Sequence, residues 1–225
     1  MYIRVNGVEL YYEVVGEGYP LVMLHGNRED CSIFDASSSV LRERYKVHLL
    51  DSRCHGRSSD GPLAYEILGD DLISFVAALN IDRPVVYGFS DGAIAALCAA
   101  VKRPDLFSSL ILSGANTSPS GIRFPSLLLM CLGYLFTRNK YDRLMLTGPY
   151  LKETDLEKID IPVLVTAGEH DVVKRSDTEF IASSIPHSKL MILSGEDHGS
   201  YIVHSRRIAD IIMEEDFFLR STEHS

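Results

Sequence analysis

Residues 84–97 read Pro-Val-Val-Tyr-Gly-Phe-Ser-Asp-Gly-Ala-Ile-Ala-Ala-Leu, and this stretch decides the fold. The β-branched run at its start predicts a buried strand, and the alanine-rich run after Gly92 predicts a helix. Ser90 lies between them in the pattern Gly-x-Ser-x-Gly. Between a strand and a helix, this pattern is typical of a tight turn that exposes the serine hydroxyl. The stretch therefore predicts an activated serine at the carboxyl end of a strand, which indicates acyl transfer or hydrolysis.

The size and charge of the chain limit the classes of function. A chain of 225 residues is long enough for one domain, or for one domain with an insertion. Its formal net charge is −9, and an acidic surface repels phosphate backbones. We therefore expect no nucleic-acid partner and a small-molecule acyl substrate instead.

The cysteines and the apolar runs indicate a compartment. Cys31, Cys54, Cys98 and Cys131 form no Cys-x-x-Cys pair, so we expect free thiols in a reducing environment. The first residues contain no signal-peptide core. The longest apolar run, residues 127–136, is about half of the ~20 residues that a membrane-spanning helix needs. These features predict a cytoplasmic protein with no membrane partner.

Strand and helix patterns alternate along the chain. We expect strands at residues 2–5, 8–15, 20–26, 45–50, 106–112, 161–167 and 189–193, with a further strand directly before Ser90. We expect helices at about residues 33–44, 65–79, 91–104, 176–184 and 202–218, the last with apolar positions at Ile208, Ile211, Ile212 and Phe218. Buried strands that alternate with helices predict an α/β fold with a doubly wound, mostly parallel sheet.

One segment interrupts this alternation. More than 40 residues separate the strands expected at 106–112 and 161–167, and they carry helical signals without a clear strand. We expect residues 1–115 and 161–225 to form the core and residues 116–160 to form a small helical cap over the active site. A long crossover that only packs against the core stays open as an alternative. The tail at 221–225 is expected to be frayed.

A serine hydroxyl needs a base to take its proton and a carboxylate to orient that base. In doubly wound hydrolases these groups follow the serine in the order acid, then histidine, each after a strand. Asp171 follows the expected strand at 161–167, and His198 follows the strand at 189–193. We therefore predict a triad of Ser90, Asp171 and His198. Glu169 and Asp177 are alternatives for the acid.

Four motifs in register carry a family resemblance. They are His25-Gly26, Gly88-Phe89-Ser90-Asp91-Gly92, Gly168-Glu169-His170-Asp171 and Asp197-His198-Gly199. Over essentially its whole length the chain resembles the α/β-hydrolase fold superfamily. The resemblance implies an oxyanion hole formed by the backbone N–H groups of Asn27 and Asp91. It also implies a structural role for His25.

The loop at residues 51–58 resembles the family's Asp-x-Arg-Gly-x-Gly-x-Ser loop, with Cys54 where glycine is usual. We interpret Asp51, Arg53 and Arg57 as a structural network rather than as catalytic groups. No base is indicated beside Cys54, so we do not expect a nucleophile there.

Asp91, directly after the nucleophile, has two interpretations. Gly-Phe-Ser-Asp-Gly together with Ser-Gly-Ala-Asn at 113–116 is similar to the branch that contains valacyclovir hydrolase and biphenyl-hydrolase-like proteins. That resemblance implies that Asp91 binds the α-ammonium of an amino acid ester. Alternatively, Asp91 only complements the N-terminus of its helix.

Apolar residues of the expected cap have two interpretations as well. Their side chains could line an acyl pocket or form the cap's own core: Phe124, Leu127, Met130, Tyr134 and Leu146. We take Phe124 and Met130 as tentative substrate contacts.

These features predict a serine hydrolase that cleaves a small carboxylic ester through an acyl-enzyme. A triad-dependent C–C bond hydrolase or lyase stays open as an alternative, as does a ligand-binding module without turnover. The histidines have no His-Glu-x-x-His spacing, and there is neither a Gly-x-Gly-x-x-Gly loop nor a Walker pattern. We therefore expect no metal and no cofactor.

Overall fold

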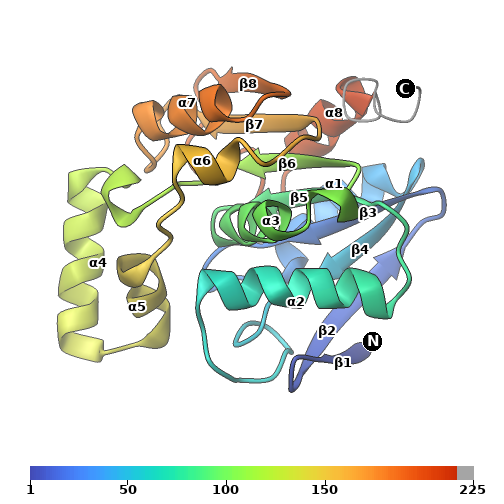
Figure 1. The fold of residues 1–225 in the computed structure, drawn as a ribbon, viewed down its shortest axis with the longest axis horizontal. Coiled ribbons are helices and arrows are strands. Elements are labelled where there is room, and N and C mark those ends of the chain that lie inside the picture. The colour runs from blue at the N-terminus through green and yellow to red at the C-terminus, as the bar shows by residue number, and fades with distance from the viewer. Residues whose placement is uncertain (217–225) are drawn as a thin grey trace.

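Eight strands form one sheet in the order β1-β2-β4-β3-β5-β6-β7-β8 in the computed structural model, which describes residues 1–216 (Figure 1). The strands are β1 (Tyr2–Val5), β2 (Val8–Val15), β3 (Tyr19–Leu24), β4 (Tyr45–Leu50), β5 (Val85–Phe89), β6 (Ser109–Ser113), β7 (Val163–Gly168) and β8 (Ser188–Leu193). The helices are α1 (Asp35–Leu41), α2 (Tyr65–Ala78), α3 (Asp91–Lys102), α4 (Phe124–Thr137), α5 (Lys140–Thr147), α6 (Glu153–Leu156), α7 (Arg175–Ser184) and α8 (Arg207–Glu214), with short 3-10 turns at Cys31–Phe34, Pro104–Leu106 and Pro119–Gly121.

The sheet is antiparallel at one edge and parallel elsewhere. β1 and β2 form a hairpin whose turn, Asn6-Gly7, has positive φ at both residues, as a type I′ turn requires. β2 runs antiparallel to β4, whereas every pairing from β4 through β8 is parallel. The carboxyl ends of six strands therefore meet at one edge of the sheet. The predicted doubly wound, mostly parallel fold is confirmed.

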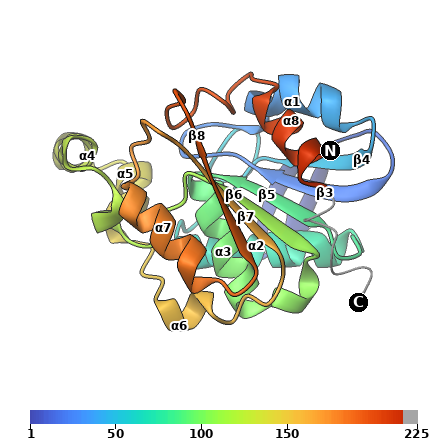
Figure 2. The ribbon, with the colours of Figure 1, turned by 90° about the horizontal axis from the view of Figure 1, so that it is seen from above.

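Helices cover both faces of the sheet (Figures 1 and 2). Helices α1 and α8 lie on one face, and helices α2, α3 and α7 lie on the other. Strand β3 shows how the faces are divided: Val22 and Leu24 pack with α2 and α3, whereas Leu21 and Met23 pack with the α1 and α8 side. Because side chains on both faces are buried, the central strands read as continuous apolar runs.

The last helix begins later than predicted, so its expected start at about residue 202 was wrong. Residues 201–204 form turns in which the Ile202 N–H donates to the Gly199 carbonyl, and α8 begins only at Arg207. Ser205 Oγ accepts the Arg207 N–H just before the helix, whose N-cap residue is Arg206. The predicted core positions Ile208, Ile211 and Ile212 are buried. Phe218 and the tail at 221–225 lie outside the described residues.

The strand expected at 106–112 also starts later. Residues 104–106 form a 3-10 turn that begins at Pro104, and β6 starts at Ser109. Proline at the first position favours this turn because its φ is preset and its missing N–H is not needed there.

Three helices, α4, α5 and α6, lie between β6 and β7, and within residues 114–162 the structure contains no strand of the sheet. Helices α4 and α5 stand away from the sheet at one end of the molecule (Figure 2). Leu156 of α6 is instead fully buried in the core, where α6 packs against α3 and α7. Across residues 1–216, no helix combines the length and apolar character required to cross a bilayer.

Candidate active site

Ser90 occupies a strained turn between β5 and α3. Its φ is 51° and its ψ is −114°, in the left-handed half of φ that side chains rarely adopt. A Cβ on Gly88 would lie 2.5 Å from the Ala93 Cα, and a Cβ on Gly92 would lie 2.4 Å from the Leu24 carbonyl oxygen. Both glycines are therefore required for the close approach of α3 to the sheet. The turn lifts the Ser90 side chain to the carboxyl edge, as a nucleophile elbow does.

The structure brings His198 and Asp171 to the same edge. Ser90 Oγ lies 3.1 Å from His198 Nε2, and His198 Nδ1 lies 2.7 Å from Asp171 Oδ1. Asp171 follows β7 and His198 follows β8, so residues distant in the sequence form one chain of hydrogen bonds. The Asp171 carboxylate accepts the Nδ1–H, which leaves Nε2 as an acceptor for the serine proton. This arrangement can support nucleophilic catalysis.

The two alternative acids are turned elsewhere. Glu169 accepts hydrogen bonds from the Ser194 hydroxyl and the Gly195 N–H on the surface. Asp177 accepts both the N–H and the hydroxyl of Thr117. Neither carboxylate contacts His198, so Asp171 is the acid that geometry selects.

Gly114, which the sequence reading missed as a site residue, makes room for the histidine ring. It follows β6 with φ +63°, and a Cβ there would lie 2.6 Å from His198 Cε1. Any side chain at this position would displace the ring from Ser90. Phe89 packs on another side of His198, with the ring centroids 5.0 Å apart. The ring is thus held by packing as well as by Asp171.

Two backbone N–H groups beside Ser90 are available for an oxyanion. As the first residue of α3, Asp91 has no acceptor for its N–H within the helix. Within residues 1–216 the Asn27 N–H donates no hydrogen bond either. Asn27 is held near Asp91 because its Nδ2 donates to Asp91 Oδ2 at 2.7 Å. The predicted oxyanion donors therefore lie on adjoining segments.

The Asp91 carboxylate is buried, and each of its oxygens accepts a hydrogen bond. Its Oδ1 accepts the Tyr65 hydroxyl at 2.7 Å, while its Oδ2 accepts Asn27 Nδ2. Burial raises the pKa of the Asp91 carboxyl, and the hydrogen bonds from Tyr65 and Asn27 oppose that rise. Asp91 does not line the cavity beside Ser90.

A cavity of about 170 Å³ opens beside Ser90. It is lined by Gly26, Asn27, Glu29, Phe89, Ser90, Met130, Met145, Val172 and His198. Met130 of α4 and Met145 of α5 bring two helices of the segment between β6 and β7 to the same cavity as Ser90. Phe124, the other tentative substrate contact, is 70% exposed and lies outside this lining. Glu29, Met145 and Val172 were not singled out from the sequence, because no local pattern marks them.

His25 joins the ends of two strands. Its Nδ1 lies 2.7 Å from the Gly26 carbonyl, and its Nε2 accepts the Ser52 N–H at 3.0 Å. These two contacts require a neutral ring that carries its proton on Nδ1 and donates it to the Gly26 carbonyl. Burial lowers the pKa of His25 to about 4. The ring ties the loop after β3 to the loop after β4 and does not contact Ser90.

The loop at residues 51–58 makes structural contacts, as expected. Asp51 accepts the N–H groups of Cys31 and Arg57, and Arg53 forms a buried two-pronged ion pair with Asp71. Cys54 adopts φ 67°, the left-handed conformation usually left to glycine. The cysteine therefore adopts a backbone conformation that glycine would take more easily.

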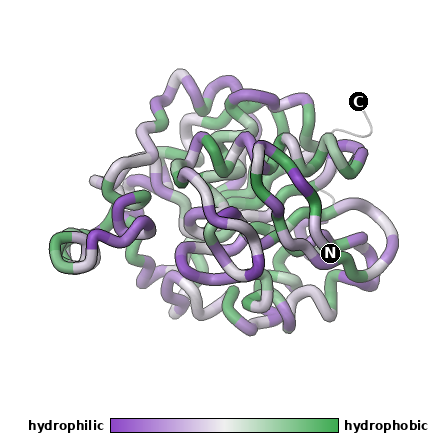
Figure 3. Tube along the Cα trace, turned by 90° about the horizontal axis from the view of Figure 1, so that it is seen from below, coloured by the Kyte–Doolittle hydropathy of each residue, from purple (hydrophilic) through white to green (hydrophobic). Residues whose placement is uncertain are grey.

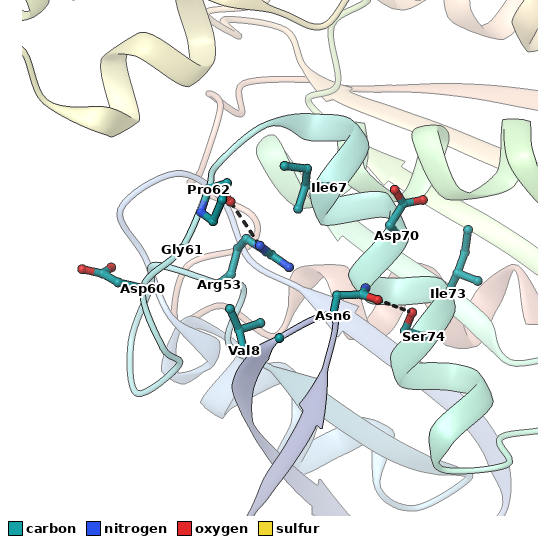
Figure 4. A pocket seen from close by; sticks show the side chains of 11 residues that line it. Asn6, Val8, Arg53, Asp60, Gly61, Pro62, Ile67, Asp70, Ile73 and Ser74 are labelled. Atoms are coloured by element: carbon teal, nitrogen blue, oxygen red, sulfur yellow. Dashed lines mark hydrogen bonds between the residues drawn. The ribbon is translucent and has the colours of Figure 1, made fainter.

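A further cavity lies away from Ser90. Its volume is about 580 Å³, and it lies between the β1–β2 turn, the loop after β4 and helix α2 (Figure 4). Arg53 faces this cavity, but its guanidinium already binds Asp71 and the Pro62 carbonyl. No nucleophile and base meet there, so the smaller cavity beside Ser90 is the candidate active site. Among residues 1–216, no three or more His, Cys, Asp or Glu side chains are grouped to hold a metal.

Comparison with known proteins agrees with this geometry. Residues 19–144 match the family model of the alpha/beta hydrolase fold. The chain is 36% identical over 119 residues to the sn-1-specific diacylglycerol lipase ABHD11 of Danio rerio, which covers 50% of this chain and 37% of that protein. The matched part is thus little more than a third of the lipase's own length.

Two further proteins match nearly the whole chain. Serine hydrolase BPHL of Homo sapiens is 26% identical over an aligned length of 250 residues, which covers 96% of this chain and 84% of that protein. A solved structure described as "Est816 as an N-Acyl homoserine lactone degrading enzyme" superposes with a TM-score of 0.78 at 21% identity, covering 97% of this chain and all of that one. This last likeness is one of fold.

Proposed function

This chain belongs to the α/β-hydrolase fold family, and we propose that it is a serine hydrolase that cleaves a small carboxylic ester through an acyl-enzyme. The observation that carries the proposal is the hydrogen-bonded chain from Ser90 Oγ through His198 to Asp171 at a strained strand-to-helix turn. Relatives named as a lipase and as a serine hydrolase support it.

In the first half of the reaction, Ser90 Oγ attacks the ester carbonyl carbon while His198 Nε2 takes the hydroxyl proton. Asp171 orients the ring and stabilises the imidazolium. The oxyanion that forms accepts hydrogen bonds from the backbone N–H groups of Asn27 and Asp91. The dipole at the N-terminus of α3 also stabilises its negative charge. When the intermediate collapses, His198 gives its proton to the leaving alkoxide, and an acyl-enzyme and an alcohol result.

In the second half, a water molecule attacks the acyl-enzyme and His198 takes its proton. The intermediate expels Ser90 Oγ, which recovers its proton from His198, and a carboxylic acid leaves. Residues 116–160 act as the cap in this proposal, because Met130 and Met145 line the same cavity as Ser90 and limit the space for the acyl group. Small acyl groups fit the cavity of about 170 Å³ best.

Substitution of the nucleophile tests this proposal. Ser90→Ala should lower the hydrolysis of short-chain 4-nitrophenyl esters by at least about 10⁴-fold, because the triad acts as a unit. It should also abolish labelling by a fluorophosphonate. Ser39→Ala removes an exposed hydroxyl from α1, outside the site, and should leave both signals unchanged. Ester turnover near the wild-type rate in Ser90→Ala would overturn the mechanism.

The same assay separates the remaining functions. Labelling of Ser90 without hydrolysis of any ester, together with cleavage of a C–C bond in a diketone substrate, would replace the ester hydrolase by a C–C hydrolase. Labelling without any product would indicate a ligand-binding role.

A further inference from the structure

Glu29 presents a carboxylate to the cavity that holds Ser90 and His198. Its Oε2 accepts the Gly26 N–H at 2.9 Å. A Cβ placed on Gly26 would lie 2.7 Å from Glu29 Oε2 and 3.2 Å from Ser90 Cβ. Glu29 Oε2 and Ser90 Cβ both lie close to this Cβ position. The distance between these two atoms is therefore no greater than the sum of the two distances. An acyl group bound to Ser90 would lie within reach of the carboxylate.

In the described part of the chain, the Glu29 carboxylate forms no ion pair with a lysine, arginine or histidine. Within residues 1–216 its only hydrogen-bond donor is the Gly26 N–H, whereas a carboxylate can accept about four hydrogen bonds. The cavity lining contains neither lysine nor arginine. The neighbouring Arg28 turns to Asn139 and Asp142 instead.

Burial supports this view of the charge. Partial burial raises the pKa of the Glu29 carboxyl, which the Gly26 N–H and His198 partly oppose. The protein groups around Glu29 therefore under-compensate its ionised form. A cation that enters the cavity would relieve this cost, and an anion would increase it.

Asp91 cannot offer the same contact. Both of its oxygens accept short hydrogen bonds from Tyr65 and Asn27, and Asn27 rather than Asp91 lines the cavity. Asp91 thus holds the Asn27 side chain in place without itself lining the cavity. Of the two carboxylates beside Ser90, Glu29 is the one that lines the cavity.

We propose that Glu29 binds a cationic group of the substrate, an ammonium close to the scissile carbonyl, and that it disfavours acyl groups that carry a carboxylate. This inference rests on the proposed serine hydrolase function. An ammonium one or two carbons from the carbonyl would donate a charge-assisted hydrogen bond to Oε1, in a cavity where water competes poorly.

Three benzyl esters of similar size test the proposal at pH 6.5: 2-aminobutanoate as the cation, butanoate as the neutral ester and the succinate half ester as the anion. For the wild type we expect kcat/KM to fall in that order, with about a tenfold preference for cationic over neutral ester. Glu29→Gln should reduce this ratio to about 1. The amide oxygen of glutamine still accepts the Gly26 N–H, and the ratio cancels any effect of the charge on His198.

Two variants act as matched controls. Asp30→Asn removes one negative charge from the next residue but keeps the side-chain cap on Ser32, and the preference should persist. Asp91→Asn should also keep the preference, although its activity on every ester is expected to change. A preference lost in Asp91→Asn and kept in Glu29→Gln would overturn the proposal. Equal losses on all three esters in Glu29→Gln would leave Glu29 a positioning residue for the Gly26 loop and would overturn it too.

Hydrolysis of the neutral ester, and its loss in Ser90→Ala, reports on the hydrolase function independently of Glu29. Binding of the cationic ester to Ser90→Ala, measured by calorimetry, tests Glu29 without turnover. The affinity should fall about tenfold in Ser90→Ala/Glu29→Gln. Equal affinities would overturn the role of Glu29 even if no ester is hydrolysed.

Discussion

Helices α3 and α4 are both built almost entirely of apolar residues, but α3 is buried and α4 is largely exposed. Residues 91–100 of α3 are all buried between the sheet and α2, whereas α4 has no buried residue. Leu129 and Phe136 of α4 are 72% and 81% exposed. Figure 3 shows α4 as an apolar coil at the edge of the molecule, apart from the sheet.

The difference teaches that apolar composition does not fix burial. The alanines of α3 are small enough for the helix to lie close against β3 and β5, and this approach brings its N-terminus directly behind Ser90. The leucines and phenylalanines of α4 face outward because α4 packs mainly on α5. Only its inner side, with Met130, takes part in the site.

Equal truncations in the two helices should give the largest contrast. Leu97→Ala in α3 should lower the free energy of unfolding by about 2–5 kcal/mol, because it leaves a cavity in a closed core. Leu129→Ala in α4 should change it by less than about 0.5 kcal/mol. Urea unfolding followed by circular dichroism measures both. Similar losses in the two variants would mean that α4 is covered in solution.

Acid should lower the free energy of unfolding through protonation of His25, which is buried in the core. The pKa of His25 is lowered to about 4 in the folded protein from 6.5, so the unfolded chain binds more protons between these values. Stability is therefore lost as the pH falls from about 6.5 to about 4, by up to about 3 kcal/mol. Urea unfolding across this range should show a shallower pH dependence in His25→Asn than in the wild type.

Leu129→Ala should follow the wild-type pH dependence, since α4 does not contact the His25 ring. An identical slope in His25→Asn and in the wild type would show that His25 accepts a proton within the folded core.

The next largest loss of stability should come from disturbing the tight packing of α3 against the sheet. Gly92→Ala should destabilise the fold by about 1–3 kcal/mol, because its Cβ would press on the Leu24 carbonyl. Ser126→Ala in α4 serves as the counterpart and should stay within about 0.5 kcal/mol. Thermal unfolding would compare the two. A neutral Gly92→Ala would mean that α3 can move away from β3 without cost.

The smallest change in the free energy of unfolding is expected for substitutions on the exposed side of α4. Leu129→Gln combined with Phe136→Gln should leave the free energy of unfolding within about 0.5 kcal/mol, yet it should reduce the binding of a hydrophobic dye. Fluorescence of 8-anilinonaphthalene-1-sulfonate reports the second effect. Unchanged dye fluorescence would show that these side chains are not an open apolar surface.

The sequence by itself determined the sheet and the order of the reacting groups. Strand and helix periodicity depends on local contacts, so strands such as Tyr2–Val5 and Tyr45–Leu50 were predicted with their observed bounds. Ser90, Asp171 and His198 were predictable because each follows a strand, and the carboxyl ends of parallel strands meet. The start of α8 was missed because Tyr201 and Ile202 continue the apolar pattern while their backbone turns.

Only the tertiary structure decided which groups line the cavity beside Ser90. Glu29 and Ser90 are 61 positions apart, and nothing local to either places them at one cavity. The engagement of Asp91 by Tyr65 and Asn27, the space that Gly114 leaves for His198, and the exposure of α4 likewise depend on what packs opposite each residue. Periodicity reports the face of an element, whereas the partner across that face is set by long-range packing.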